Sequence, residues 1–149
     1  MVSGSNISNM DHTISALLEF KGIGKAIAWY KKVLGAEENM RIENAKGKVT
    51  YAELVIGDSM IFLKDNDSQF PELTYNRPTD FHVHIRRVDK TINTALQNDA
   101  MLIVPAMDQD YGDRSGCIRD PFGYSWYLTS DARNIYHKGM GNRKGGFAA

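Results

Sequence analysis

The sequence predicts an α+β fold of two βαβββ modules, because the same order of elements occurs twice along 149 residues. Lys25–Ala28 and Lys90–Asn93 open corresponding helices, and Ile56–Met60 and Phe122–Trp126 open corresponding last strands. A spacing of roughly 65 residues is too long for a solenoid repeat and indicates a duplicated unit. A single module buries too little apolar surface by itself, which favours association of the two.

The first module is expected over residues 12–66, after a flexible N-terminus at 1–11. Its first strand is predicted from His12 to Phe20, a stretch rich in β-branched and apolar residues. A helix follows from Lys25 to Leu34 and ends at Gly35, because glycine readily closes a helix. Ile23, Ile27, Tyr30 and Leu34 recur at helical spacing and form the predicted buried stripe, with Trp29 also in the core. Three strands are then expected over Glu37–Ile42, Val49–Ile56 and Met60–Lys64.

The second module is expected over residues 80–130, after a connector at 67–79. It comprises a strand at Asp80–Arg86, a helix at Val88–Asn98 and strands at Met101–Met107, Arg114–Arg119 and Tyr124–Thr129. Residues 131–149 form a basic, glycine-rich tail, which we expect to be flexible.

A tight polar turn joins the last two strands. Pro121 presets φ near the value that a turn requires, and Gly123 accepts positive φ at little steric cost. Asp120 can accept hydrogen bonds from backbone amides across the bend. The phrase Asp120–Gly123 therefore predicts a hairpin.

Composition excludes several classes of function. Eighteen basic and eighteen acidic side chains cancel, so no long-range field recruits nucleic acid or an anionic membrane. The only cysteine, Cys117, cannot form an internal disulfide. No apolar run approaches the length of a membrane span, and the N-terminus shows no signal segment, so we expect a cytoplasmic protein.

Three phrases in this order resemble a known family. They are Ala26–Ala36 with its WYKKVLGA motif, Ala52–Ser59, and Asp113–Trp126 with the DPFG turn. Over residues 12–130 the chain resembles the vicinal oxygen chelate superfamily of glyoxalases, bleomycin-resistance proteins and extradiol dioxygenases, and most of all its PhnB-like branch. The resemblance implies curved mixed sheets around a cleft and a homodimer.

Catalytic members of that family hold a divalent ion with His and Glu side chains. Transferred by position, the pattern places Ser15 at the first ligand and Tyr127 at the last, neither of which is a convincing donor. The corresponding place in the first module's last strand is Ile61 or Phe62, and the second module's first strand offers Asp80. One carboxylate does not hold an ion of this kind, so we expect no metal cofactor.

The strand from Asp80 leaves an alternative open. Residues two apart in a strand share a face, so Asp80, His82 and His84 point the same way, while Phe81 and Val83 face the helices. These three polar side chains could hold a divalent metal in an unorthodox site.

We expect a ligand-binding cleft lined by Ser15, Asp80, His82, His84, Ser125 and Tyr127, with Tyr111 and Arg114 at its rim. Phe70 and Tyr75 are further candidates for stacking on a flat organic molecule. The leading hypothesis is a metal-independent, small-molecule-binding protein of the bleomycin-resistance type, with no assigned catalytic residue. The alternatives are a metal-dependent lyase, isomerase or dioxygenase using His82, His84 and Asp80, and a regulatory or structural dimer.

Overall fold

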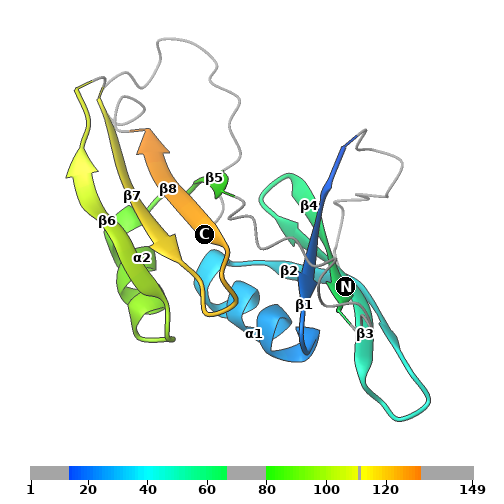
Figure 1. Ribbon diagram of the computed structural model, residues 1–149. Helices are drawn as coiled ribbons and strands as arrows, with labels where there is room; N and C mark the ends of the chain where they lie inside the picture. The colour runs from blue at the N-terminus through cyan, green and yellow to red at the C-terminus, as the bar shows by residue number, and fades with distance from the viewer. Residues whose placement is uncertain (1–13, 67–79, 111, 132–149) are drawn as a thin grey trace. The chain divides into compact units, whose positions relative to one another are not determined.

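The computed structural model describes residues 14–66, 80–110 and 112–131, with the backbone alone at Asp131. Its internal contacts divide the chain into two compact units, residues 1–75 and 76–149 (Figure 1). The expectations for the N-terminus, the connector, the tail, Phe70, Tyr75 and Tyr111 lie outside the described residues. Each unit is described by itself.

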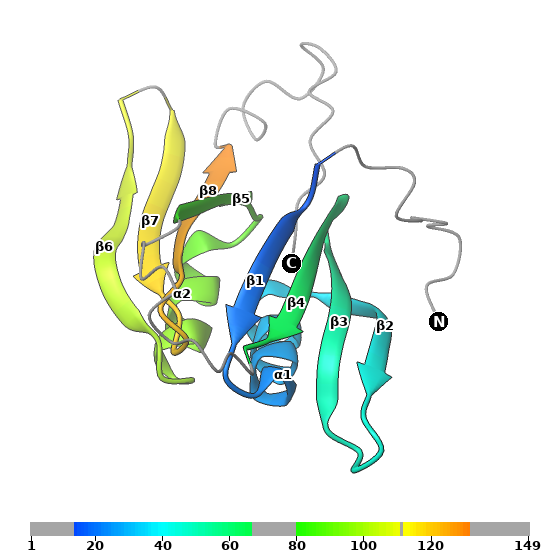
Figure 2. The same ribbon diagram turned by 45° about the vertical axis from the view of Figure 1, so that its right-hand side comes forward.

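The first unit has the predicted βαβββ order. Its elements are β1 (Ala16–Phe20), α1 (Ile23–Leu34), β2 (Glu37–Glu43), β3 (Val49–Ile56) and β4 (Ser59–Asp65). The strands form a sheet in the order β1-β4-β3-β2, in which β1 is parallel to β4 and the other pairs are antiparallel. Helix α1 packs along one side of this sheet (Figure 2).

The second unit repeats this arrangement. Its elements are β5 (Asp80–His84), α2 (Val88–Leu96), β6 (Met101–Asp108), β7 (Asp113–Arg119) and β8 (Ser125–Asp131). The sheet order is β5-β8-β7-β6, again with the first strand parallel to the last and the other pairs antiparallel. The predicted α+β class, with two βαβββ modules and mixed sheets, is therefore confirmed.

Helix α1 begins two residues before the predicted start at Lys25, because Gly22 makes the turn into it. Gly22 has a φ of 82° and no side-chain cap. Its amide donates instead to Oδ1 of Asp65 at 2.9 Å, and Oδ2 of the same carboxylate binds Lys48 Nζ at 2.9 Å. Gly35 ends the helix as predicted, with a φ of 67°.

The core of the first unit lies between α1 and its sheet. The predicted stripe of Ile23, Ile27, Tyr30 and Leu34 is fully buried. The ring of Tyr30 packs edge-on against Phe20 of β1 at 6.0 Å and against Trp29 at 5.4 Å. Trp29 is buried, as expected.

The core of the second unit shows how closely α2 approaches its sheet. A Cβ added at Gly116 of β7 would lie 2.8 Å from Ile92 Cδ1 and 3.0 Å from the Val104 carbonyl oxygen. On the same side of the sheet, Phe81 stacks on the buried Trp126 with ring centroids 4.8 Å apart.

The turn before β8 forms as predicted. Oδ1 of Asp120 accepts the amides of Phe122 and Tyr124 at 2.9 and 3.0 Å, and Oδ2 accepts Trp126 Nε1–H at 2.9 Å. Gly123 has a φ of 99°. One buried carboxylate thus fixes both the turn and the first core residue of β8.

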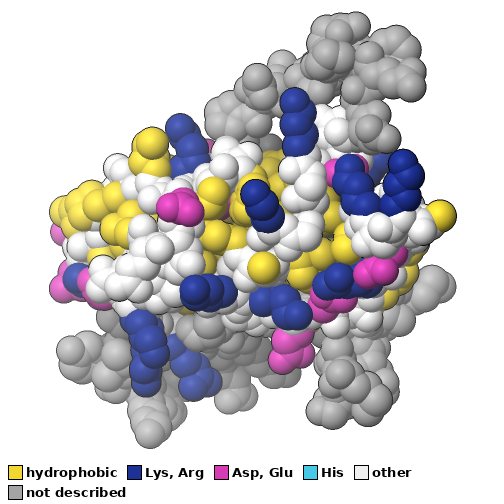
Figure 3. Space-filling model, turned by 90° about the horizontal axis from the view of Figure 1, so that it is seen from below, with side chains coloured by type: hydrophobic (Ala, Val, Ile, Leu, Met, Phe, Trp, Pro, Cys, Tyr) yellow, Lys and Arg dark blue, Asp and Glu magenta, His cyan; other side chains and the backbone are white. Residues whose placement is uncertain are grey.

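The edge strand β6 carries large apolar side chains that remain exposed. Met101 is 60% exposed and Met107 is 53% exposed, with Leu102, Ile103 and Val104 also exposed between them. Figure 3 shows hydrophobic side chains gathered on the side of the molecule where β6 lies. Among the described residues, no helix is long and apolar enough to cross a membrane.

Candidate functional site

The two sides of the second sheet differ in chemistry. Positions 114 and 116 of β7 face α2, since the Arg114 side chain pairs with Asp89 of α2 and a Cβ added at Gly116 would meet Ile92. Partners in adjacent strands share a face, so the strand register defines the opposite, helix-free side. We call it the histidine face, and it comprises Asp80, His82, His84, Ser115, Cys117, Arg119, Ser125, Tyr127 and Thr129.

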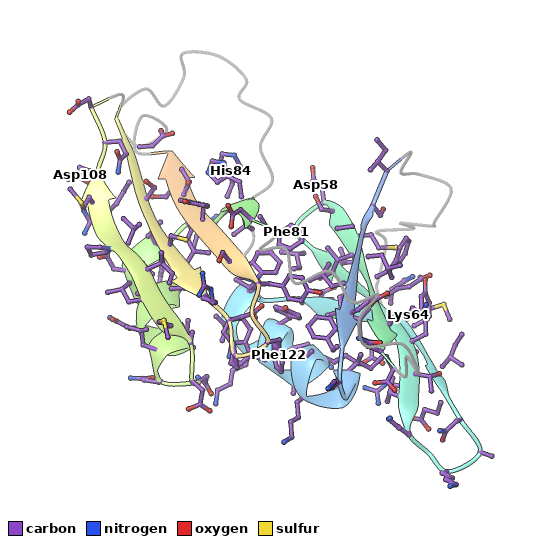
Figure 4. The ribbon with its side chains drawn as sticks, viewed as in Figure 1. Asp58, Lys64, Phe81, His84, Asp108 and Phe122 are labelled. Atoms are coloured by element: carbon purple, nitrogen blue, oxygen red, sulfur yellow. The ribbon has the colours of Figure 1, made fainter. Side chains whose placement is uncertain are left out.

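The two histidines lie side by side on this face. Burial along β5 alternates, with Asp80, His82 and His84 exposed and the residues between them half-buried. The rings of His82 and His84 stack with centroids 5.3 Å apart and planes at 25°. Figure 4 labels His84 and Phe81 on this strand. The expected common orientation of Asp80, His82 and His84 therefore agrees with the structure.

The neighbouring strand β8 brings an aromatic ring and a hydroxyl group to His82. Tyr127 is 42% exposed, and its ring meets His82 edge-on at 6.4 Å. His82 Nε2 lies 2.6 Å from Oγ1 of the buried Thr129. Thr129 was missed by the sequence reasoning, although it has the same strand parity as Ser125 and Tyr127.

Further polar groups lie near His82, Tyr127 and Thr129 on the same face. Ser125 lies on the face as expected, but it is buried. Cys117 is buried beside Tyr127 in the strand register, and burial raises the pKa of its thiol, with the charge of Asp80 acting in the same direction. Arg119 opposes the latter effect. The face therefore combines hydroxyl, imidazole, carboxylate and guanidinium groups.

The structure does not bring Arg114 together with the histidines. Its guanidinium donates to both carboxylate oxygens of Asp89 at 2.7 and 2.9 Å and to Asp108 at 3.0 Å. These contacts lower the pKa of Asp89, chiefly through the hydrogen bond. Arg114 thus ties α2 to β6 and β7 from the helix side; Figure 4 labels Asp108.

Ser15 belongs to the first unit, where it is half-buried just before β1. Tyr111 lies outside the described residues. The side chains that the structure gathers from the predicted set are therefore Asp80, His82, His84, Ser125 and Tyr127.

The donor chemistry of these side chains does not fit the divalent ion that catalytic family members hold. The two positions nearest the histidines on β8 carry a hydroxyl and a phenol, which are poor ligands when neutral. Across the described ranges, no group of three or more His, Cys, Asp or Glu side chains could hold a metal ion. Asp80, His82 and His84 share a face without forming such a group.

The helix-free side of the first sheet has a different polar centre, which the sequence reasoning also missed. Glu53 on β3 is only 2% exposed. Its carboxylate accepts hydrogen bonds from Asn39 Nδ2 at 2.9 Å and from the Tyr51 hydroxyl at 3.1 Å. Burial, followed by the contact with Glu53, raises the pKa of Tyr51. The ring of Tyr51 stacks on Phe62 of β4.

Comparison with known proteins agrees with this architecture. Residues 11–128 match the sequence model of the Glyoxalase/Bleomycin resistance protein/Dioxygenase superfamily. The chain belongs to this family, and the resemblance noted in the sequence is confirmed.

The similar proteins named below are at most 29% identical to this chain. An uncharacterized protein of Mycobacterium bovis is 29% identical over 134 residues, covering 85% of this chain and 88% of that protein. TioX from Micromonospora sp. ML1 has a TM-score of 0.64 at 20% identity, covering 80% of this chain and 95% of that one. A PhnB protein from Bacillus cereus has the same TM-score at 19% identity, with 80% and 99% covered. The fosfomycin resistance protein FosX from Listeria monocytogenes has a TM-score of 0.61 at 19% identity, with 83% and 93% covered. These similarities establish the fold alone.

Proposed function

We propose that this protein binds a small organic ligand with a flat ring against the histidine face, without a metal ion. The observation that carries the proposal is the exposed set of three adjacent rings, namely His82, His84 and Tyr127, on the helix-free side of a sheet. Flat rings offer stacking surface at low cost in conformational entropy, and imidazole can both donate and accept hydrogen bonds. The family includes bleomycin-resistance proteins, whose type of function this proposal follows.

Catalysis is the less supported alternative. An imidazole beside a carboxylate could act as a base, but abstraction of a proton next to a carbonyl also needs a group that stabilises the resulting oxyanion. Two arginines are candidates for that role. Arg114 lies on the α2 side and is engaged by Asp89 and Asp108, whereas Arg119 lies on the histidine face but level with Ser125 and Asp80 rather than with the histidines. We therefore assign no catalytic residue.

Binding can be tested with three probes that share one ring system and differ in charge: 2-naphthoate, 2-naphthylmethylamine and 2-naphthylmethanol. Calorimetry in the presence of EDTA should detect binding of at least one probe. The double variant His82→Ala, His84→Ala should weaken that binding by at least about tenfold, because it removes two stacking surfaces. Lys25→Ala, an exposed change on α1, serves as the control.

Three results would count against the proposal. These are no binding of any probe, equal affinity in the double variant and the unaltered protein, and binding that EDTA abolishes. Elemental analysis of the purified protein complements the last of these. A stoichiometric metal that disappears from the double variant would instead favour the metal-dependent alternative.

We further propose that the protein is a cytoplasmic homodimer. Exposed apolar side chains on the two sheets support the dimer, notably Leu17 on β1 at 55% exposed and Met101 on β6 at 60%. The lone Cys117, which cannot form an internal disulfide, is consistent with a reducing compartment. Light scattering should give twice the 16.7 kDa mass of one chain. A monomer mass at all concentrations would contradict the dimer.

A further inference from the structure

We infer that Thr129 is a positioning residue: it engages one nitrogen of the His82 ring in a hydrogen bond and leaves the other nitrogen to contact the ligand. The inference deepens the proposed binding site and rests on it only for its second test. The hydrogen bond between His82 Nε2 and Thr129 Oγ1 is short, at 2.6 Å. Thr129 is 3% exposed, so water competes little for its hydroxyl group.

The hydrogen bond distinguishes the two nitrogens of the His82 ring, which the two ring contacts of His82 do not. His84 stacks on one face of the His82 ring, and Tyr127 approaches edge-on. Such contacts fix the plane of an imidazole but barely distinguish its two nitrogens. A hydrogen bond to one nitrogen selects the ring orientation, that is, which nitrogen faces Thr129. Because a hydroxyl group both donates and accepts, the bond is compatible with either tautomer of His82. Thr129 therefore orients the His82 ring so that Nδ1 is the nitrogen that contacts a ligand on the histidine face.

The strand register explains why this pairing arises. In the parallel pair of β5 and β8, Tyr127 lies beside His82 and Thr129 lies beside His84. The Thr129 hydroxyl thus reaches diagonally to the histidine before its own partner. Both histidines share the ring stack, but within the described part of the chain only His82 bonds to a hydroxyl group, so the two differ chemically.

Other ionisable groups lie near His82. Asp80 and His84 flank it on β5, Tyr127 faces it from β8, and Cys117 and Arg119 lie on β7 of the same face. Helix α2 lies on the opposite side of the sheet. The test therefore reports the orientation of the His82 ring itself.

Thr129→Ser and Thr129→Ala form a matched pair, because both lose the methyl group and only the second loses the hydroxyl. Nuclear Overhauser contacts of the two carbon-bound ring protons of His82 with Tyr127 and with residue 129 distinguish the two ring orientations. We expect one orientation of His82 in the unaltered protein and in Thr129→Ser, and a mixture of two in Thr129→Ala. The same single orientation in both variants would overturn the inference.

The second test uses the naphthyl probe that binds most tightly. Thr129→Ala should bind it about five- to tenfold more weakly than Thr129→Ser, as expected for loss of one oriented hydrogen bond. If the ring orientation changes but the affinity does not, the ligand does not use His82 Nδ1, and the binding part of the inference fails. If no probe binds at all, the proposed function fails, while the orientation of the His82 ring still decides the role of Thr129.

Discussion

The carboxylate of Asp120 is the most heavily engaged polar group of the DPFG turn. Two backbone amides and the indole N–H of Trp126 donate to it, and the side chain is 3% exposed. Removal of the carboxylate would leave the buried indole N–H and two part-buried amides without that acceptor, which costs free energy for each donor. The turn and the core of the second unit therefore depend on a single side chain.

Asp120→Ala should lower the free energy of unfolding by about 2–4 kcal/mol, because one buried and two part-buried donors lose their acceptor. Urea denaturation followed by tryptophan fluorescence measures the change. Asp58→Ala, in the exposed turn between β3 and β4, is the control and should change stability by less than about 0.5 kcal/mol. Equal effects of the two substitutions would contradict this role of Asp120.

Asp65 makes a pH-dependent contribution to stability. Its side chain is 7% exposed, and its contacts with Lys48 and then with the Gly22 amide lower its pKa below the ordinary 3.8. A lowered folded-state pKa stabilises the protein above the ordinary value, and this stabilisation is lost as pH falls through the folded-state pKa.

Asp65→Asn removes the charge but keeps an acceptor for the Gly22 amide. At pH 7 the free energy of unfolding of the variant should be about 1–2 kcal/mol lower than that of the unaltered protein, as expected for loss of a charged hydrogen-bond partner. As the pH falls below 3.8 and then through the lowered folded-state pKa, this difference should shrink toward zero, because Asp65 becomes protonated in the unaltered protein. Urea titrations from pH 2 to pH 7 test this, and a difference that is independent of pH would contradict it.

Helix α2 can pack closely on its sheet because β7 has no side chain at Gly116. A methyl group there would crowd Ile92 and the backbone of β6. Gly24 in α1 is the opposite case, since an added Cβ would meet no heavy atom within 4 Å and its φ is not positive.

Gly116→Ala should destabilise the protein by about 1–3 kcal/mol through overpacking. Gly24→Ala should stabilise it by about 0.4–1 kcal/mol, because alanine restricts the unfolded chain and suits a helix. Thermal unfolding of both variants provides the comparison. A neutral Gly116→Ala would show that α2 is not closely packed on β7.

Helices and strands of this protein follow well from local patterns, because burial on one side of each element sets the spacing of its apolar residues. The stripe of α1, the alternation along β5 and the DPFG turn were all predictable in this way. The boundaries of the elements were less predictable. The turn at Gly22 that precedes α1 is held by a hydrogen bond to Asp65, which lies 43 residues away in the sequence. Contacts between distant segments leave no periodic signal.

The candidate site was predictable only in part, because it combines residues from several strands. Strand parity predicts that His82 and His84 share a face with each other, and that Ser125 and Tyr127 do the same. It could not predict that Thr129 binds His82, because this depends on how β5 and β8 are aligned. Nor could it predict the engagement of Arg114 by Asp89 of α2, or the buried Glu53 of the first unit. These depend on pairing between elements.

A crystal structure with the best-binding naphthyl probe, combined with an anomalous-scattering scan, tests the central claim most directly. Our account predicts the probe's ring against His82, His84 and Tyr127, with no cation held by protein side chains. A probe bound away from the histidine face, or one bound through a metal ion that His82 and His84 coordinate, would contradict it.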